Sequence, residues 1–275
     1  MWLFVKFAAG LAALYLIVVA LIALAQDWLL FPRWAIGEGA ILPGSAERLA
    51  IEVPSGATLV GVRLPAERKS PAETALVLAF GGNAWSADVL AVYLHSVIAD
   101  RDVVAFHYRG YGPSTGHPSA RALLQDAVSI HDHLAGTLGS ERIVVVGLSI
   151  GAGPAAYLAS QRPISGLILV TPFDSLAALA REHYPWAPVG LLLRHRMQVA
   201  DALASSSAPV AIISAERDTV VPARRTAPVR RAARDIVLDR VIGDAGHNDL
   251  YDRTEFKRAL REALSLVEGT VQRRP

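Results

Sequence analysis

Residues 142–153 constrain the fold of this chain more than any other stretch, because they encode a strand, a tight turn and a helix without a break. Residues 143–146 are β-branched and apolar, which is typical of a strand covered on both faces. The next five residues, Gly147-Leu148-Ser149-Ile150-Gly151, fit the pattern G-x-S-x-G. In this pattern the serine occupies a strained turn with positive φ, and glycines on either side avoid a steric collision.

The pattern alone is weakly specific, since G-x-S-x-G arises by chance in roughly one chain in ten of this length. Its context favours a catalytic serine, because a buried strand precedes it and a helix over residues 150–160 follows. That helix directs its N-terminal amides and its dipole toward the turn. We therefore predict that Ser149 is a nucleophile.

Strand and helix patterns alternate along the rest of the chain. Strands at 49–53 and 58–63 flank Pro54-Ser55-Gly56 and predict an antiparallel hairpin. Further strands are predicted at 75–80, 103–107, 166–171, 209–214 and 236–241, and helices at 86–99, 120–138, 223–234 and 249–267. Such alternation predicts an α/β fold with a mostly parallel sheet and helices on both faces.

One connection, between the strands ending at 171 and starting at 209, is too long for an ordinary loop. We interpret residues 174–208 as a lid or pocket wall over the catalytic edge of the sheet, with a packed helical connection as the alternative. Tyr184 and Trp186 lie in its middle, and we predict that they contact the substrate.

The N-terminal segment is strongly apolar. Residues 7–25 carry no charge and would form a helix of about 28 Å, close to the hydrocarbon thickness of a bilayer. We expect residues 1–25 to be a membrane anchor, 26–44 a connector and 45–275 the folded domain. A cleaved signal peptide is the alternative, since Ala23-Leu24-Ala25 supplies a small-x-small site, and the protein would then be secreted.

The charge around this segment bears on its orientation. Lys6 precedes the span and Arg33 is the nearest base after it, so the positive-inside rule leans toward a single-pass protein with its domain outside the cytoplasm.

Composition excludes several classes of function. The 275 residues suffice for one large domain, and the absence of cysteine excludes disulfides, a cysteine nucleophile and thiolate metal sites. The net charge is +2, and the arginines of residues 224–234 are interpreted as a solvated helix face rather than a nucleic-acid site. No metal or organic cofactor is implied, and the oligomeric state is not determined by the sequence.

A serine nucleophile needs a base, and a histidine base needs a carboxylate. Among eight histidines, we predict His247 as the base, because it lies in a loop after a late strand, beside Gly246. His117 is the alternative base. We predict Asp218 as the carboxylate that orients the histidine. It follows the strand at 209–214, at the sheet edge where ligand sites of α/β proteins lie. Glu216 and Asp244 are the alternative acids.

The developing oxyanion needs backbone N–H donors from two sides. We predict Ile150, directly after the serine, as one donor. The other comes from the glycine-rich loop after residues 75–80, where Asn83 is the first choice and Ala84 the second. Ser86 closes this loop as a helix cap.

Taken together, these motifs resemble the α/β-hydrolase superfamily, in its small, often membrane-anchored branch of serine hydrolases or serine aminopeptidase-like proteins. The similar segments are residues 26–32, 80–84, 108–114, 171–175, 218–222 and 246–249. Two positions depart from the family pattern: Gly81 stands where a histidine is usual, and His107 where an aspartate often precedes Tyr-Arg-Gly. The order Ser149, Asp218, His247 is the order of that superfamily.

The resemblance implies a hydrolase of esters, thioesters or amides acting through an acyl-enzyme, on a small-molecule or lipid-like acyl substrate. A thioesterase acting on acylated membrane proteins is a variant of this hypothesis. A membrane-tethered, non-catalytic scaffold or binding protein with the same fold is the alternative from another class.

Overall fold

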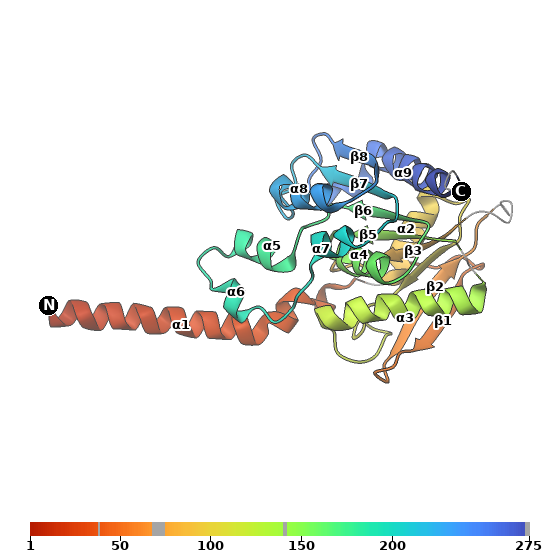
Figure 1. Cartoon of the computed structure of the whole chain (residues 1–275). Helices are drawn as coiled ribbons and strands as arrows, with labels where there is room; N and C mark the ends of the chain where they lie inside the picture. The colour runs from red at the N-terminus through yellow and green to blue at the C-terminus, as the bar shows by residue number, and fades with distance from the viewer. Residues whose placement is uncertain (38, 68–74, 140–141, 273–275) are drawn as a thin grey trace.

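An eight-stranded sheet forms the centre of the structure, a computed structural model that describes residues 1–37, 39–67, 75–139 and 142–272 (Figure 1). Its strands follow the order β1-β2-β4-β3-β5-β6-β7-β8. Their bounds are β1 Glu47–Glu52, β2 Thr58–Leu64, β3 Leu76–Phe80, β4 Val103–Phe106, β5 Ile143–Leu148, β6 Gly166–Val170, β7 Val210–Ala215 and β8 Ile236–Ile242.

The pairing is mostly parallel, as predicted. β1 and β2 form the expected antiparallel hairpin, β2 pairs antiparallel with β4, and all remaining neighbours are parallel. The carboxyl ends of β3, β5, β6, β7 and β8 therefore share one edge of the sheet, where α/β proteins place their ligand sites.

Helices cover both faces of the sheet, which confirms the predicted fold class. On one face, α2 (Ala87–Val97) and α9 (Thr254–Gln272) pack onto residues such as Val77 and Val146. On the other face, a second apolar cluster joins the sheet to α3 (Ala120–Leu138), α4 (Ala152–Gln161), α7 (Val199–Ala204) and α8 (Ala223–Ala232). Strands β3 to β7 are buried along their whole length.

Serine caps start three of the helices. The side chains of Ser86, Ser119 and Ser175 each accept a hydrogen bond from the backbone N–H three residues later, at the start of α2, α3 and α5 respectively. Each cap satisfies a donor that the first helical turn leaves free. The predicted cap at Ser86 is confirmed.

The N-terminal helix α1 (Trp2–Leu30) projects from the body of the protein (Figure 1). Among the described residues it is the single helix long and apolar enough to cross a membrane. It continues five residues beyond position 25, so the first part of the predicted connector is helical. Gln26 is buried, because this last part of the helix packs against the domain. A short 3-10 turn, η1 (Arg33–Ala35), follows.

The long connection after β6 contains α5 (Leu176–His183), α6 (Val189–Leu192) and α7. α5 and α6 lie on the side from which α1 projects (Figure 1). The predicted lid covers residues 174–208; below, the word lid is used for its first part, residues 174–193, which precedes the segment that leads into α7.

The segment after β8 also differs from the prediction: residues 249–252 form a 3-10 turn, η3 (Asp249–Asp252), and α9 starts only at Thr254.

Close packing of β6 on α9 generates a stability prediction. A Cβ on Gly166 would come within 2.7 Å of Val267 Cγ2. Gly166→Ala should therefore lower the free energy of unfolding by about 1–3 kcal/mol through overpacking. Gly136→Ala in α3 is the control, because nothing lies within 4 Å of its added Cβ; it should raise that free energy by up to about 1 kcal/mol. Denaturant unfolding measures both, and equal effects would contradict the packing.

Candidate active site

Ser149 occupies the turn between β5 and α4, as the first residue of the 3-10 turn η2 (Ser149–Gly151). Its φ of +53° lies in the left-handed region, which is strained for a residue with a side chain. A Cβ on Gly147 would lie 2.6 Å from Gly151 O, and a Cβ on Gly151 would lie 2.7 Å from Gly81 O. Both glycines are therefore required sterically, as the spacing predicts.

His247 and Asp218 lie beside this serine. His247 Nε2 is 3.0 Å from Ser149 Oγ, and His247 Nδ1 is 2.8 Å from Asp218 Oδ2. A carboxylate only accepts, so Nδ1–H donates to Asp218 and leaves Nε2 free to accept from the serine hydroxyl. The structure thus brings together the three side chains that the sequence selects.

Asp218 is buried and fixed by its own loop. Its Oδ1 accepts from Val220 N at 2.9 Å and Val221 N at 2.7 Å. The loops after β7 and β8 are joined through Arg217 N, which donates to Ala245 O at 2.8 Å. These bonds fix the position of the Asp218 carboxylate and join its loop to the loop that carries His247. Both loops lie at the carboxyl edge of the sheet.

The loop after β3 lies against the serine turn. Gly151 packs against the carbonyls of Phe80 and Gly81, and a Cβ on Gly82 would lie 3.9 Å from Ser149 Cβ. This contact places the backbone of residues 81–85, including Asn83, next to the turn that carries Ile150. The loop after β3 therefore lies beside Ser149, and the amides of Asn83 and Ile150 stay the predicted donors to an oxyanion.

Two tyrosines hold this loop. Tyr108 OH donates to Gly81 O at 2.7 Å, and Tyr111 OH donates to Asn83 Oδ1 at 3.2 Å. Burial raises the pKa of both phenols, so they remain donors at neutral pH. Tyr108 thus supports the turn at the position where the family usually has a histidine. A Cβ on Gly81 would lie 3.3 Å from both Leu90 Cδ2 and Trp85 Cβ, so that position has little room for a ring.

The other departure, His107, is also accommodated by its neighbours. His107 is buried and faces Asp88, with Nε2 3.5 Å from its Oδ1. Arg48 donates two hydrogen bonds to the same carboxylate, at 2.7 and 3.0 Å. Burial lowers the pKa of the His107 imidazole against the opposing influence of Asp88, which favours the neutral form.

The rival residues have other surroundings. His117 is exposed on the loop between β4 and α3. Glu216 Oε2 accepts from Asp244 N at 2.9 Å, and the Asp244 carboxylate pairs with Arg217. Across the described ranges, no cluster of three or more histidine, aspartate or glutamate residues is arranged to hold a metal ion.

Tyr184 and Trp186 are half exposed and lie in the lid, beside α1. They line an apolar groove whose described lining includes none of Ser149, Asp218 and His247. The structure therefore places these two residues at the junction of lid and helix, and their contact with the substrate stays a prediction.

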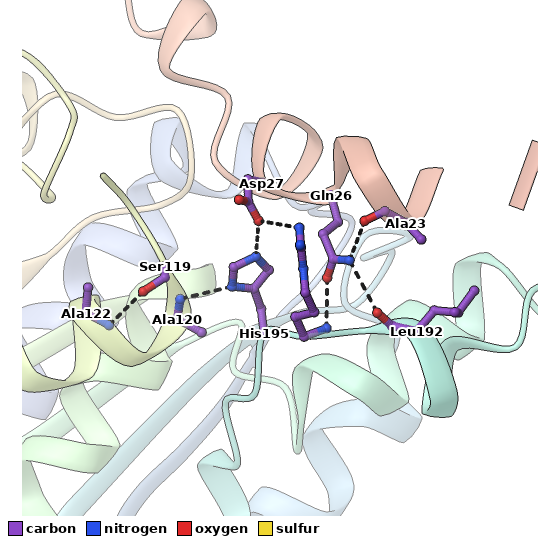
Figure 2. Close-up of polar contacts among 9 residues, drawn as sticks. Ala23, Gln26, Asp27, Ser119, Ala120, Ala122, Leu192 and His195 are labelled. Atoms are coloured by element: carbon purple, nitrogen blue, oxygen red, sulfur yellow. Dashed lines mark hydrogen bonds and ion pairs between the residues drawn. The ribbon is translucent and has the colours of Figure 1, made fainter. Parts of the chain in front are cut away.

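Sequence reasoning missed the polar contacts at this junction. Gln26, Asp27 and His195 join α1 to the chain that follows the lid (Figure 2). A polar Gln-Asp pair directly after the apolar run of residues 7–25 is a signal for such a contact, but the partner of the pair cannot be read from local sequence.

Comparisons with known proteins agree with this fold. The family model described as alpha/beta hydrolase fold matches residues 75–189. The uncharacterized protein Rv2307c of Mycobacterium tuberculosis (strain ATCC 25618 / H37Rv) is 35% identical over 232 residues, which cover 82% of this chain and 81% of that protein. The crystal structure of the Pyrococcus furiosus esterase Pf2001 is 18% identical, with a TM-score of 0.66 over 84% of this chain and 97% of that chain.

A further relative is larger. The lysophosphatidylserine lipase ABHD12 of Macaca fascicularis is 30% identical over 198 residues, which cover 60% of this chain and 49% of that protein. The chain thus matches about half the length of this lipase. The fold and these relatives define a hydrolase. The chain belongs to the α/β-hydrolase fold family.

The tyrosine contacts generate a prediction about the loop after β3. Tyr111→Phe removes the donor to Asn83 and should cost about 1 kcal/mol locally. Hydrogen exchange at the amides of residues 81–85 should therefore become faster. Tyr157→Phe is the control, because Tyr157 lines a surface hollow beside Arg109 and Arg162. Unchanged exchange in Tyr111→Phe would show that the loop is held by something else.

Proposed function

We propose that this hydrolase cleaves an acyl ester, thioester or amide through an acyl-enzyme formed on Ser149. The observation that carries the proposal is the continuous hydrogen-bonded series from Asp218 through His247 to Ser149, at 2.8 and 3.0 Å. A serine hydroxyl is a weak nucleophile until a positioned base accepts its proton, and His247 Nε2 is within hydrogen-bond reach for that transfer.

In the proposed reaction, Ser149 Oγ attacks the substrate carbonyl while His247 Nε2 accepts the hydroxyl proton. The tetrahedral oxyanion accepts hydrogen bonds from the amides of Ile150 and Asn83. His247 then donates its proton to the leaving group and next activates the water that releases the acyl group. Asp218 holds the imidazole tautomer and stabilises its charged form.

We propose a lipid-like acyl substrate at a membrane surface. The support is the long apolar helix α1, together with the lipase name carried by the ABHD12 relative. The helix fits single-pass anchoring, and the proposed orientation has the catalytic domain outside the cytoplasm, as the charges of Lys6 and Arg33 favour.

Removing the nucleophile or the base tests the mechanism. Ser149→Ala and His247→Ala should each reduce hydrolysis of a nitrophenyl ester on the order of a millionfold, because the residues act as a unit. His117→Ala is the matched control and should retain wild-type turnover, since His117 is exposed on another loop. Wild-type hydrolysis by Ser149→Ala would refute the proposal.

Replacing the acid by its amide tests the role of the tautomer. Asp218→Asn should reduce kcat by about ten-thousandfold, because the amide favours the wrong imidazole tautomer. Glu216→Gln is the control, since its Oε2 accepts only from a neighbouring loop amide. A similar loss in both variants would assign the effect to the loops rather than to Asp218.

A further inference from the structure

An apolar groove lies between residues 19–30 of α1 and the lid. Its volume is about 330 Å³, within the range of pockets that hold small ligands, about 300–1,000 Å³. The helix contributes Val19, Ile22, Ala23, Gln26, Leu29 and Leu30. Tyr184, Trp186, Val189, Leu192 and Leu193 are among the lid residues that complete the lining.

The groove is lined mainly by apolar side chains. Its most polar lining residue, Gln26, uses its whole side chain elsewhere: Oε1 accepts from Arg194 N at 2.8 Å, and Nε2 donates to Ala23 O at 2.6 Å and Leu192 O at 3.3 Å (Figure 2). Binding there must come from burial of apolar surface, which fits a hydrocarbon chain and disfavours a polar ligand.

The lid lies alongside the apolar part of α1. Tyr15 OH donates to Trp186 O at 3.0 Å, and the two rings meet edge to face at 6.4 Å. From Tyr15 to Gln26 the helix rises about 16 Å. The part of the apolar run before Tyr15 is too short to cross a bilayer of about 30 Å by itself. A membrane that contains α1 therefore also reaches the lid.

The outer surface of the lid suits that position. Leu191 is 83% exposed and Trp186 is 47% exposed. Large apolar side chains exposed in this way are typical of a surface that contacts a membrane. Arg181 and Arg196 both approach Gly190, where Arg196 Nη2 donates to the backbone carbonyl at 3.2 Å. Long arginine side chains reach lipid headgroups from apolar surroundings, so these two arginines suit a lid that lies at the membrane surface.

Polar contacts fix the domain end of the groove. Ala120 N donates to His195 Nδ1 at 3.3 Å, so His195 Nε2–H donates to Asp27 Oδ1, at 2.6 Å (Figure 2). These contacts tie the end of α1 to the segment after the lid and to the start of α3. The two walls of the groove are therefore joined at its domain end.

The lid also contacts the loop of the proposed acid. His183 Nε2 donates to Val220 O at 2.8 Å, and Val220 N donates to Asp218 Oδ1 at 2.9 Å. Tyr184, the next residue after His183, lines the groove. The lining of the groove is thus adjacent in sequence to His183, which is hydrogen-bonded to the loop that carries Asp218.

We infer that this groove binds one acyl chain of a membrane lipid, which enters sideways from the bilayer between α1 and the lid. The role of the groove rests on the proposed function, since the groove would present the ester of that lipid to the catalytic domain. The substrate class is then a membrane lipid. The binding itself needs no chemistry at Ser149 and is testable without turnover.

The test uses the full-length Ser149→Ala protein in phosphatidylcholine vesicles that contain a phosphatidylcholine with a diazirine at the end of one acyl chain. After illumination and trypsin digestion, the part of the lid after Arg181 is recovered in one peptide, residues 182–194, which we call the lid peptide, and the helix as residues 7–33. The helix peptide is labelled in every variant because α1 faces lipid, and it serves as the internal reference.

Two substitutions on α1 separate the groove from general lipid contact. Ile22→Trp fills the groove. Leu24→Trp adds the same ring outside the groove, at a residue that is 74% exposed. We expect labelling of the lid peptide, relative to the helix peptide, to fall about tenfold in Ile22→Trp, equivalent to about 1.4 kcal/mol of binding, and to stay unchanged in Leu24→Trp. Ala180→Phe, which fills the groove from the lid, should repeat the loss.

An unlabelled lid peptide, or equal labelling in Ile22→Trp, Ala180→Phe and Leu24→Trp, would overturn the groove as an acyl-chain site. The expected pattern together with an inactive wild-type protein would support the groove and refute the proposed hydrolysis. Active wild type with an unlabelled lid would refute the groove alone.

Discussion

The contact between Gly151 and the carbonyl end of β3 is the constraint on which the site depends. Only a residue without a side chain allows the start of α4 to approach Phe80 and Gly81 this closely. That approach holds Ser149 in its left-handed conformation and brings the Asn83 loop beside it. The order of the parallel strands then places the loops after β7 and β8 at the same edge, within reach of the serine.

Much of this arrangement is encoded locally and could be read from the sequence. The β-branched run before Gly147 predicts β5, and the alternation of strand and helix patterns predicts the parallel sheet. Parallel strands bring their carboxyl ends to one edge, so Asp218 and His247 could be selected as partners of Ser149 from their positions after strands. The structure adds the distances and shows which atoms of the loop after β3 the two tyrosines bind, Gly81 O and Asn83 Oδ1.

The junction of α1 and the lid could not be predicted, because it depends on contacts between residues far apart in the chain. Gln26 bonds to Leu192 and Arg194, and local sequence gives no partner for a glutamine after an apolar run. The expected connector therefore contains the last turn of the helix. The position of Tyr184 and Trp186 within the long insertion predicts that they contact the substrate; in the structure they line the groove against α1, and their contact with the substrate stays a prediction.

The central claim is that Ser149 is an activated nucleophile in this protein. A fluorophosphonate reacts covalently with such a serine, and peptide mass spectrometry locates the adduct. Treatment of the membrane-embedded protein should place a single phosphonyl group on Ser149, and the adduct should be absent after His247→Ala. An unmodified Ser149 in the folded wild-type protein would contradict the account and leave a non-catalytic member of the fold family.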